Sequence, residues 1–182
     1  MGHAIDVGRP EAGDIIDLIL DDHRRMELLL RMLRDSSADR DAVRAALATV
    51  LIAHAEAEEA VVYPKLRARS AVTAHDAEHG EEEHAEGHEA LLGVLELKGT
   101  DTAAFDDAVE ELSKAINHHL AEEELSILNP ARDELGDRAR GDMGAAFAAE
   151  RNRLVADGCG TLTNLRRIVR RSRREGLLDD DG

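Results

Sequence analysis

The sequence predicts an all-α fold, an antiparallel up-down-up-down four-helix bundle with a C-terminal helical extension. Aromatic residues make up only 2% of the 182 residues, so the core has to be built from Leu, Ala, Val and Ile, in a chain rich in helix-forming residues. Apolar residues recur at helical spacing. The pattern also occurs twice, and two matching helical hairpins are expected to pack as one bundle.

Four helices are expected between residues 14 and 130. A side chain near the start of three of them can cap the first turn. These candidate caps are Asp14, either Ser37 or Asp39, and Thr102. The third helix is expected to begin in the His/Glu-rich tract 75–88. Pro64 removes a backbone donor, so the second helix is expected to stop or kink there or about a turn later.

Residues 131–182 are expected to form the extension beyond the bundle. Residues 133–157 are amphipathic, Thr161 can cap a last basic segment, and residues 179–181 form an acidic tail. The arginines of the basic segment are Arg166, Arg167, Arg170, Arg171, Arg173 and Arg174. We expect them to face the acidic helices of the same chain.

A histidine and a glutamate four residues apart occur twice, at His54 and Glu58 and again 65 positions later at His119 and Glu123. In a helix such a pair lies on one face, one turn apart. Imidazole nitrogen and carboxylate oxygen are both metal ligands. The repeated pair therefore indicates a metal site rather than a solvated acidic face.

Other histidines extend the candidate site. His23 lies in the apolar stripe of the first helix, and the same offset of 65 relates it to His88 in the third. His84 lies one turn before His88 on the same face, so both are candidates, with the repeat selecting His88. His118 could replace His119, although the repeat register favours His119.

Five histidines and two glutamates are thus expected at one level of the bundle core. Seven ligands suit two metal ions, with the glutamates as bridges, the histidines divided three and two, and one position open to a small ligand. Nitrogen and oxygen donors without thiolate suit Fe, Mn or Zn, and carboxylate bridges favour iron. The candidate ligands are His23, His54, Glu58, His84, His88, His119 and Glu123.

With these residues the sequence resembles the hemerythrin-like (HHE) cation-binding family over roughly residues 14–130. The resemblance rests on the two His/Glu pairs and on the histidines of the third helix. It also rests on Tyr63-Pro64, which follows the first pair, and on Pro130, which follows the second. It implies a non-heme site with two Fe ions, bridged by the glutamates and by an oxo or hydroxo group. It also implies binding of dioxygen, nitric oxide or peroxide. Oxygen-carrying members have a His-x-x-x-His pair on the third helix, which His84 and His88 resemble, whereas many others have one histidine there.

Charge and composition argue against several other classes. A net charge of -16 argues against a general nucleic-acid binder. No apolar run approaches the roughly 20 residues that cross a bilayer, and the first ten residues lack a hydrophobic signal core. A single cysteine, Cys159, suits a reducing compartment, so we expect a cytoplasmic protein.

Three functions are compatible with these residues. The first is a small-ligand protein for sensing or for oxidative or nitrosative protection. The second is a catalase-like di-iron enzyme that decomposes peroxide. The third is a metal-responsive regulatory module that acts through its basic C-terminal helix. Metal content separates the third from the others, and peroxide turnover separates the first two.

Overall fold

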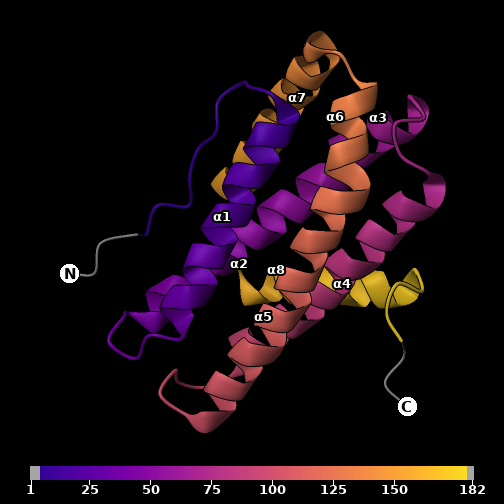
Figure 1. Ribbon diagram of the computed structural model, residues 1–182. Coiled ribbons are helices and arrows are strands. Elements are labelled where there is room, and N and C mark those ends of the chain that lie inside the picture. Colours follow the sequence, from indigo (N-terminus) through magenta and orange to yellow (C-terminus); the bar gives the residue numbers. More distant parts are fainter. Residues whose placement is uncertain (1–4, 180–182) are drawn as a thin grey trace.

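Four long antiparallel helices form the bundle in the computed structural model, which describes residues 5–179 (Figure 1). They are α1 (Ile15–Leu33), α2 (Arg40–Ala57), α4 (Ala74–Glu96) and α5 (Ala103–Glu123). Helix α1 packs on α2 and α4 packs on α5, and no strand occurs within the described range. The predicted all-α bundle is confirmed.

The helix starts are stabilised by side-chain caps. Asp14 accepts from the Ile16 N–H at 2.9 Å, and Asp39, not Ser37, caps α2. Thr102 caps α5 as expected. Helix α4 begins with a capping box formed by Thr73 and Asp76, a start that was not predicted to the residue.

A π-helical turn follows each repeated His/Glu pair. The segments beyond α2 and α5 are η1 (Glu58–Val62), α3 (Tyr63–Ala68), η2 (Glu124–Leu128) and α6 (Asn129–Glu134). Pro64 and Pro130 are the second residues of α3 and α6, in the first turn of each helix, where proline is tolerated, so the chain stays helical past both. Such turns are rare and are frequently found at functional sites.

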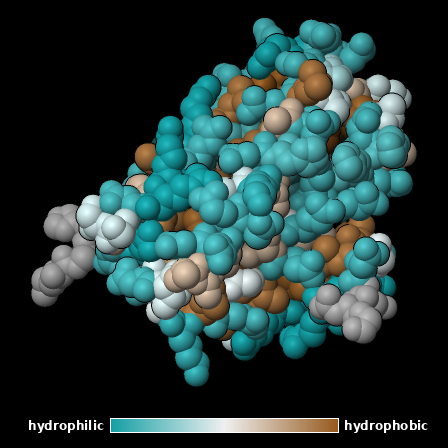
Figure 2. Space-filling model, turned by 60° about the horizontal axis from the view of Figure 1, so that its bottom comes forward, coloured by the Kyte–Doolittle hydropathy of each residue, from teal (hydrophilic) through white to brown (hydrophobic). Residues whose placement is uncertain are grey.

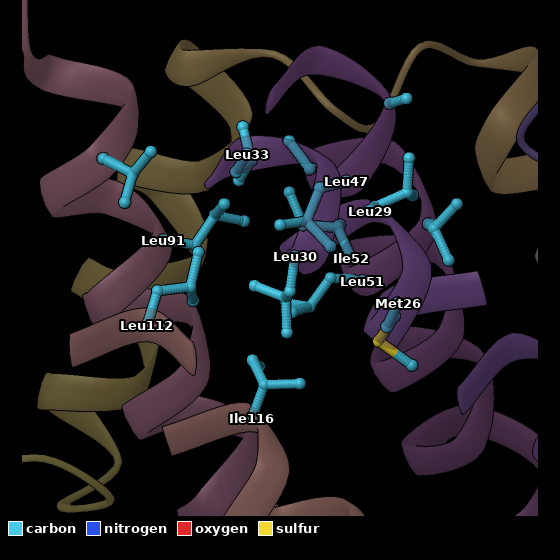
Figure 3. Close-up of a cluster of buried hydrophobic side chains, with 14 of the residues drawn as sticks. Met26, Leu29, Leu30, Leu33, Leu47, Leu51, Ile52, Leu91, Leu112 and Ile116 are labelled. Atoms are coloured by element: carbon cyan, nitrogen blue, oxygen red, sulfur yellow. The ribbon is translucent and has the colours of Figure 1, made fainter. Parts of the chain in front are cut away.

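Two apolar clusters fill the bundle, one on each side of its middle. The larger lies toward the α1–α2 and α4–α5 turns, where Leu30, Leu51, Leu91 and Leu112 meet from four helices (Figure 3). The smaller includes Ile19, from the first half of α1, and side chains of η1, α3 and η2. The level between the two clusters is where the polar residues of the core lie.

The extension contributes α7 (Asp137–Ala156) and α8 (Leu162–Arg174), which both pack on the bundle (Figure 1). Helix α7 lies against α1 and α2, and its Phe147 joins the smaller cluster. Helix α8 lies against α4, and its Leu165 and Ile168 join the larger cluster. The extension is therefore packed into the same core as the bundle.

Arginines of α8 form ion pairs with glutamates of the bundle, as expected. Arg171 binds both carboxylate oxygens of Glu56, at 2.5 and 3.1 Å. Arg166 pairs with Glu96 at 2.9 Å. The face shown in Figure 2 is largely hydrophilic, with separate hydrophobic areas. Within residues 5–179, no helix is long and apolar enough to cross a membrane.

The link between α7 and α8 is packed against α2. Cys159 is buried there, with its Sγ 3.6 Å from the carbonyl oxygen of Thr49. Burial raises the pKa of the Cys159 thiol to about 11. Because the thiolate is the reactive form, this cysteine is expected to be a packing residue.

Helix α7 approaches the start of α1 most closely at Gly144. A Cβ added there would overlap the backbone carbonyl of Gly13, which has little freedom to move. We expect Gly144→Ala to lower the free energy of unfolding by about 1–3 kcal/mol.

Gly141→Ala is the matched control on the same helix, because its Cβ would meet nothing within 4 Å. It should raise stability by up to about 1 kcal/mol. Chemical denaturation of both variants measures the difference, and equal effects would contradict the close contact.

Candidate metal centre

Six of the seven predicted ligands converge in two groups between the apolar clusters. Within each group the ligand atoms lie within 4.8 Å of one another. One group is His23, His54 and Glu123; the other is Glu58, His84 and His119. Every member is buried, and each group draws side chains from both helical hairpins. His119 points inward, whereas the side chain of His118 is 64% exposed.

Glu58 and Glu123 each lie between a histidine of one group and a histidine of the other. Glu58 Oε2 is 3.3 Å from Nε2 of both His54 and His84. Glu123 Oε2 is 3.1 Å from His23 Nε2 and 3.7 Å from His119 Nε2. Each glutamate is therefore placed to contact ligand atoms of both groups.

Each of the four histidines has a carboxylate at its other ring nitrogen. The Nδ1–oxygen distances are 3.0 Å for His23–Glu124, 3.4 Å for His54–Asp22, 2.9 Å for His84–Glu59 and 3.0 Å for His119–Glu83. An Nδ1–H donated to a carboxylate leaves Nε2 as the ligand atom and fixes the ring orientation, as is usual for metal-binding histidines.

Sequence reasoning missed two of these four carboxylates. Glu59 and Glu124 directly follow the predicted ligands Glu58 and Glu123 in the sequence, and they contact His84 and His23. Asp22 and Glu83 were not singled out. Asp22 directly precedes His23 in the sequence, and Glu83 directly precedes His84, and this was the only indication of their role. Each carboxylate contacts a histidine of the neighbouring helix of its hairpin: Asp22 contacts His54, and Glu83 contacts His119.

Most of the inner atoms of the centre lack hydrogen-bond partners, and this bears on whether metal ions fit there. Nε2 of His54, His84 and His119 and both carboxylate oxygens of Glu58 are buried and make no hydrogen bond in the described structure. The contacts of Glu58 with two imidazoles do not have hydrogen-bond geometry. Buried polar atoms are costly without a partner, and nitrogen with carboxylate oxygen is a donor set for Fe, Mn or Zn. The residues therefore fit metal ions.

Without metal, the two partners of the closest pair stabilise each other's charge. Burial alone would lower the pKa of His23, but the hydrogen bonds and charges of Glu123 and Glu124 raise it to about 9. Burial alone would raise the pKa of Glu123, but His23 and the other imidazoles hold it well below its ordinary value. Glu123 is thus a carboxylate at neutral pH, as a bridging ligand has to be.

His88 lies outside both groups. Its side chain is buried with Nε2 unpartnered, and burial together with the charge of His84 lowers the pKa of its imidazole to about 3. It is therefore neutral. No hydrogen bond to its ring is found among residues 5–179, in contrast to the four histidines that have a carboxylate behind them.

Tyr63 supports the centre from the start of α3. Its O–H donates to Glu123 Oε1 at 2.8 Å, and its ring stacks on His84 with centroids 5.6 Å apart. Gly80 of α4 leaves room for the hydroxyl, since a Cβ there would lie 2.8 Å from it. Burial and the neighbouring carboxylates raise the pKa of Tyr63 well above its ordinary value, so the donor stays protonated.

A cavity of about 10 Å³ lies between the centre and the larger apolar cluster. The rings of His54, His84 and His119 border it on one side. Its other walls include the apolar residues Met26, Leu51, Gly87, Ile116 and Leu120. A cavity of this volume holds roughly one water-sized molecule.

A helical bundle with paired histidine–glutamate groups in its core defines a histidine–carboxylate metal-binding protein. The chain belongs to the hemerythrin HHE cation-binding domain family, whose model matches residues 14–131. A DNA nickase of Nostoc sp. (strain PCC 7120 / SAG 25.82 / UTEX 2576) is 27% identical over 144 residues, which is 78% of this chain and 40% of that protein. The chain thus spans less than half of that relative's length. No solved structure matches the chain significantly.

Proposed function

We propose that the chain is a non-heme di-iron protein that binds a small ligand, dioxygen, nitric oxide or peroxide, for sensing or for oxidative or nitrosative protection. One observation carries the proposal: Glu58 and Glu123 each lie between histidines of the two groups. Iron ions held by these residues would supply reversible one-electron chemistry and affinity for a small ligand. With a single cysteine, Cys159, the proposed location is a reducing cytoplasm.

The protein residues hold the ligand atoms in place before any ion arrives. Carboxylates at the four Nδ1 atoms keep the four Nε2 atoms directed inward. Tyr63 holds one oxygen of Glu123, and the other oxygen faces His23 and His119. Such preorganisation lowers the ordering cost of binding.

The size of the cavity supports a small neutral ligand. About 10 Å³ accommodates a diatomic molecule or a single water-sized group and leaves no room for an organic substrate. The apolar side chains of Met26, Leu51 and Ile116 line it on the side away from the histidines, so a neutral ligand loses less solvation on entering it than a charged one.

The basic helix gives less support to a regulatory or nucleic-acid role. Arg166 and Arg171 of α8 are engaged by glutamates of the bundle, and the chain carries a net charge of -16. The DNA-nicking activity in the name of the Nostoc relative is therefore not proposed for this chain.

Metal analysis with optical spectroscopy tests the proposed function. Protein expressed with iron and purified in air is expected to contain two iron ions per chain and to show ligand-to-iron charge-transfer bands that change on adding azide. One zinc ion per chain with no iron, after iron-supplemented expression, would contradict the proposal. Rapid release of oxygen from added peroxide would instead favour the catalase-like alternative.

A further inference from the structure

Arg151 of α7 is a fully buried arginine next to the metal centre, and it lies beyond residues 14–131 that match the family. Its guanidinium binds both carboxylate oxygens of Asp22: Nε donates to Oδ2 at 2.5 Å and Nη2 to Oδ1 at 2.8 Å. Such a two-point contact fixes the plane of a carboxylate as well as its position.

The remaining donors of Arg151 reach the segment before α1. Nη1 donates to the carbonyl oxygen of Gly8 at 3.1 Å and Nη2 to that of Val7 at 2.8 Å. The guanidinium therefore joins α7, α1 and the N-terminal segment at one buried point. Neither the arginine nor the aspartate can turn without breaking several hydrogen bonds.

Asp22 is in turn the carboxylate behind His54, with Oδ2 3.4 Å from Nδ1. The carboxylates behind the other three histidines, Glu59, Glu83 and Glu124, have no arginine bound to them in the part of the chain that the structure describes. His54 is thus supported by a carboxylate that is itself held in place.

A second contact from α7 reaches the same histidine. Phe147 lies one turn before Arg151, and its ring meets that of His54 edge-on, with centroids 5.9 Å apart at an angle of 85°. Residues four apart share a helix face, so one face of α7 contacts both the ring of His54 and its supporting carboxylate.

We infer that Arg151 is a positioning residue of the metal centre, which acts through Asp22 to hold His54 with Nε2 directed at the ligand groups. The inference rests on the proposed metal site and adds to it a contribution from the extension. Bundle and extension would then form one functional unit.

The test compares Arg151→Gln with Arg153→Gln in the full chain. Arg153 lies on the same helix but is exposed and pairs with Glu150 and Asp157 at the surface. In iron-loaded protein, transfer of metal to a chelator is expected to be at least about 10-fold faster for Arg151→Gln, since changes behind metal ligands cost roughly 10–100-fold in affinity. Arg153→Gln should match the parent.

Two further variants separate positioning from general stability. Arg151→Lys keeps the buried charge but cannot hold both carboxylate oxygens and two carbonyls, so it should also release metal faster. A chain with both Asp22→Asn and Arg151→Gln should release metal no faster than one with Asp22→Asn alone, because both substitutions affect His54 through the same carboxylate. Parent-like release from both Arg151 variants, or additive effects in the double variant, would overturn the inference.

A magnetic-resonance readout is independent of bound metal. In ¹⁵N-labelled metal-free protein, the hydrogen-bonded Nδ1–H of His54 should be observed in the parent and in Arg153→Gln and lost in Arg151→Lys. Its persistence in that variant would overturn the inference. A parent chain that binds no iron would defeat the proposed function, and this signal would still decide the role of Arg151.

Discussion

Glu58→Ala and Glu123→Ala are each expected to lose at least one metal ion per chain. Each glutamate lies between histidines of the two groups, so its removal takes a ligand from both metal positions at once. Glu58→Ala should still fold, because both oxygens of Glu58 are buried without a hydrogen-bond partner and cost stability in the metal-free protein. Glu123→Ala removes the partner of Tyr63 and His23 and should therefore be the less stable of the two variants. Metal content and circular dichroism of the purified variants measure the two effects.

Glu122→Ala is the matched control for Glu123→Ala. The two residues are neighbours on α5, but successive side chains on a helix point about 100° apart. Glu122 is partly exposed and belongs to neither ligand group. Its variant should keep both ions, and equal metal loss in all three variants would show that the ligand assignment is wrong.

His84→Ala is expected to lose the metal ion held with Glu58 and His119, whereas His88→Ala is expected to keep both ions. His84 belongs to that ligand group, and Glu59 contacts its Nδ1 atom. His88 belongs to neither group and has no such carboxylate within the described residues. Loss of a direct ligand should cost more than the roughly 10–100-fold that follows changes behind a ligand.

Azide binding makes the comparison of these two variants sharper. If His88 acts as a fifth histidine, its removal opens a coordination position, and azide affinity changes while metal content stays the same. If it is a packing residue, both quantities should match the parent. Metal loss from His88→Ala with retention in His84→Ala would reverse the assignment made from the geometry.

The fold could be predicted from the sequence because its determinants are local or repeated. Helical periodicity and capping residues mark where α1, α2 and α5 begin. The π turns were not predicted, because an extra residue in a helical turn leaves no distinctive pattern. The prolines that follow them at 64 and 130 indicate only where a helix is disturbed.

Most of the candidate site was also predictable, but the choice between His84 and His88 was not. Periodicity shows which face of a helix a residue occupies, and these two share a face. It does not show the height along the bundle axis, where four residues amount to about 6 Å. That height depends on how the helices pack against one another.

The repeat selects His88, whereas the geometry places His84 among the ligand groups, because the second hairpin has longer arms. His23 lies 10 residues before Leu33, the last residue of α1, whereas His84 lies 12 residues before Glu96, the last of α4. The site lies two residues further from the turn in the second hairpin. His23 therefore has its structural counterpart at His84, at an offset of 61 instead of 65.

The other arm differs by the same amount. His54 lies 14 residues after Arg40, the first residue of α2, and His119 lies 16 after Ala103, the first of α5. The connections, residues 34–39 and 97–102, are equally long. An offset of 65 thus holds for the second helix of each hairpin and an offset of 61 for the first.

The carboxylates behind the histidines also set the electric charge of the centre. With neutral imidazoles, as metal binding requires, the charged side chains are six carboxylates and one guanidinium, a formal sum of -5. They are Asp22, Glu58, Glu59, Glu83, Glu123, Glu124 and Arg151. Since charge is costly to leave uncompensated in a buried site, this negative sum favours cations over neutral or anionic occupants of the centre.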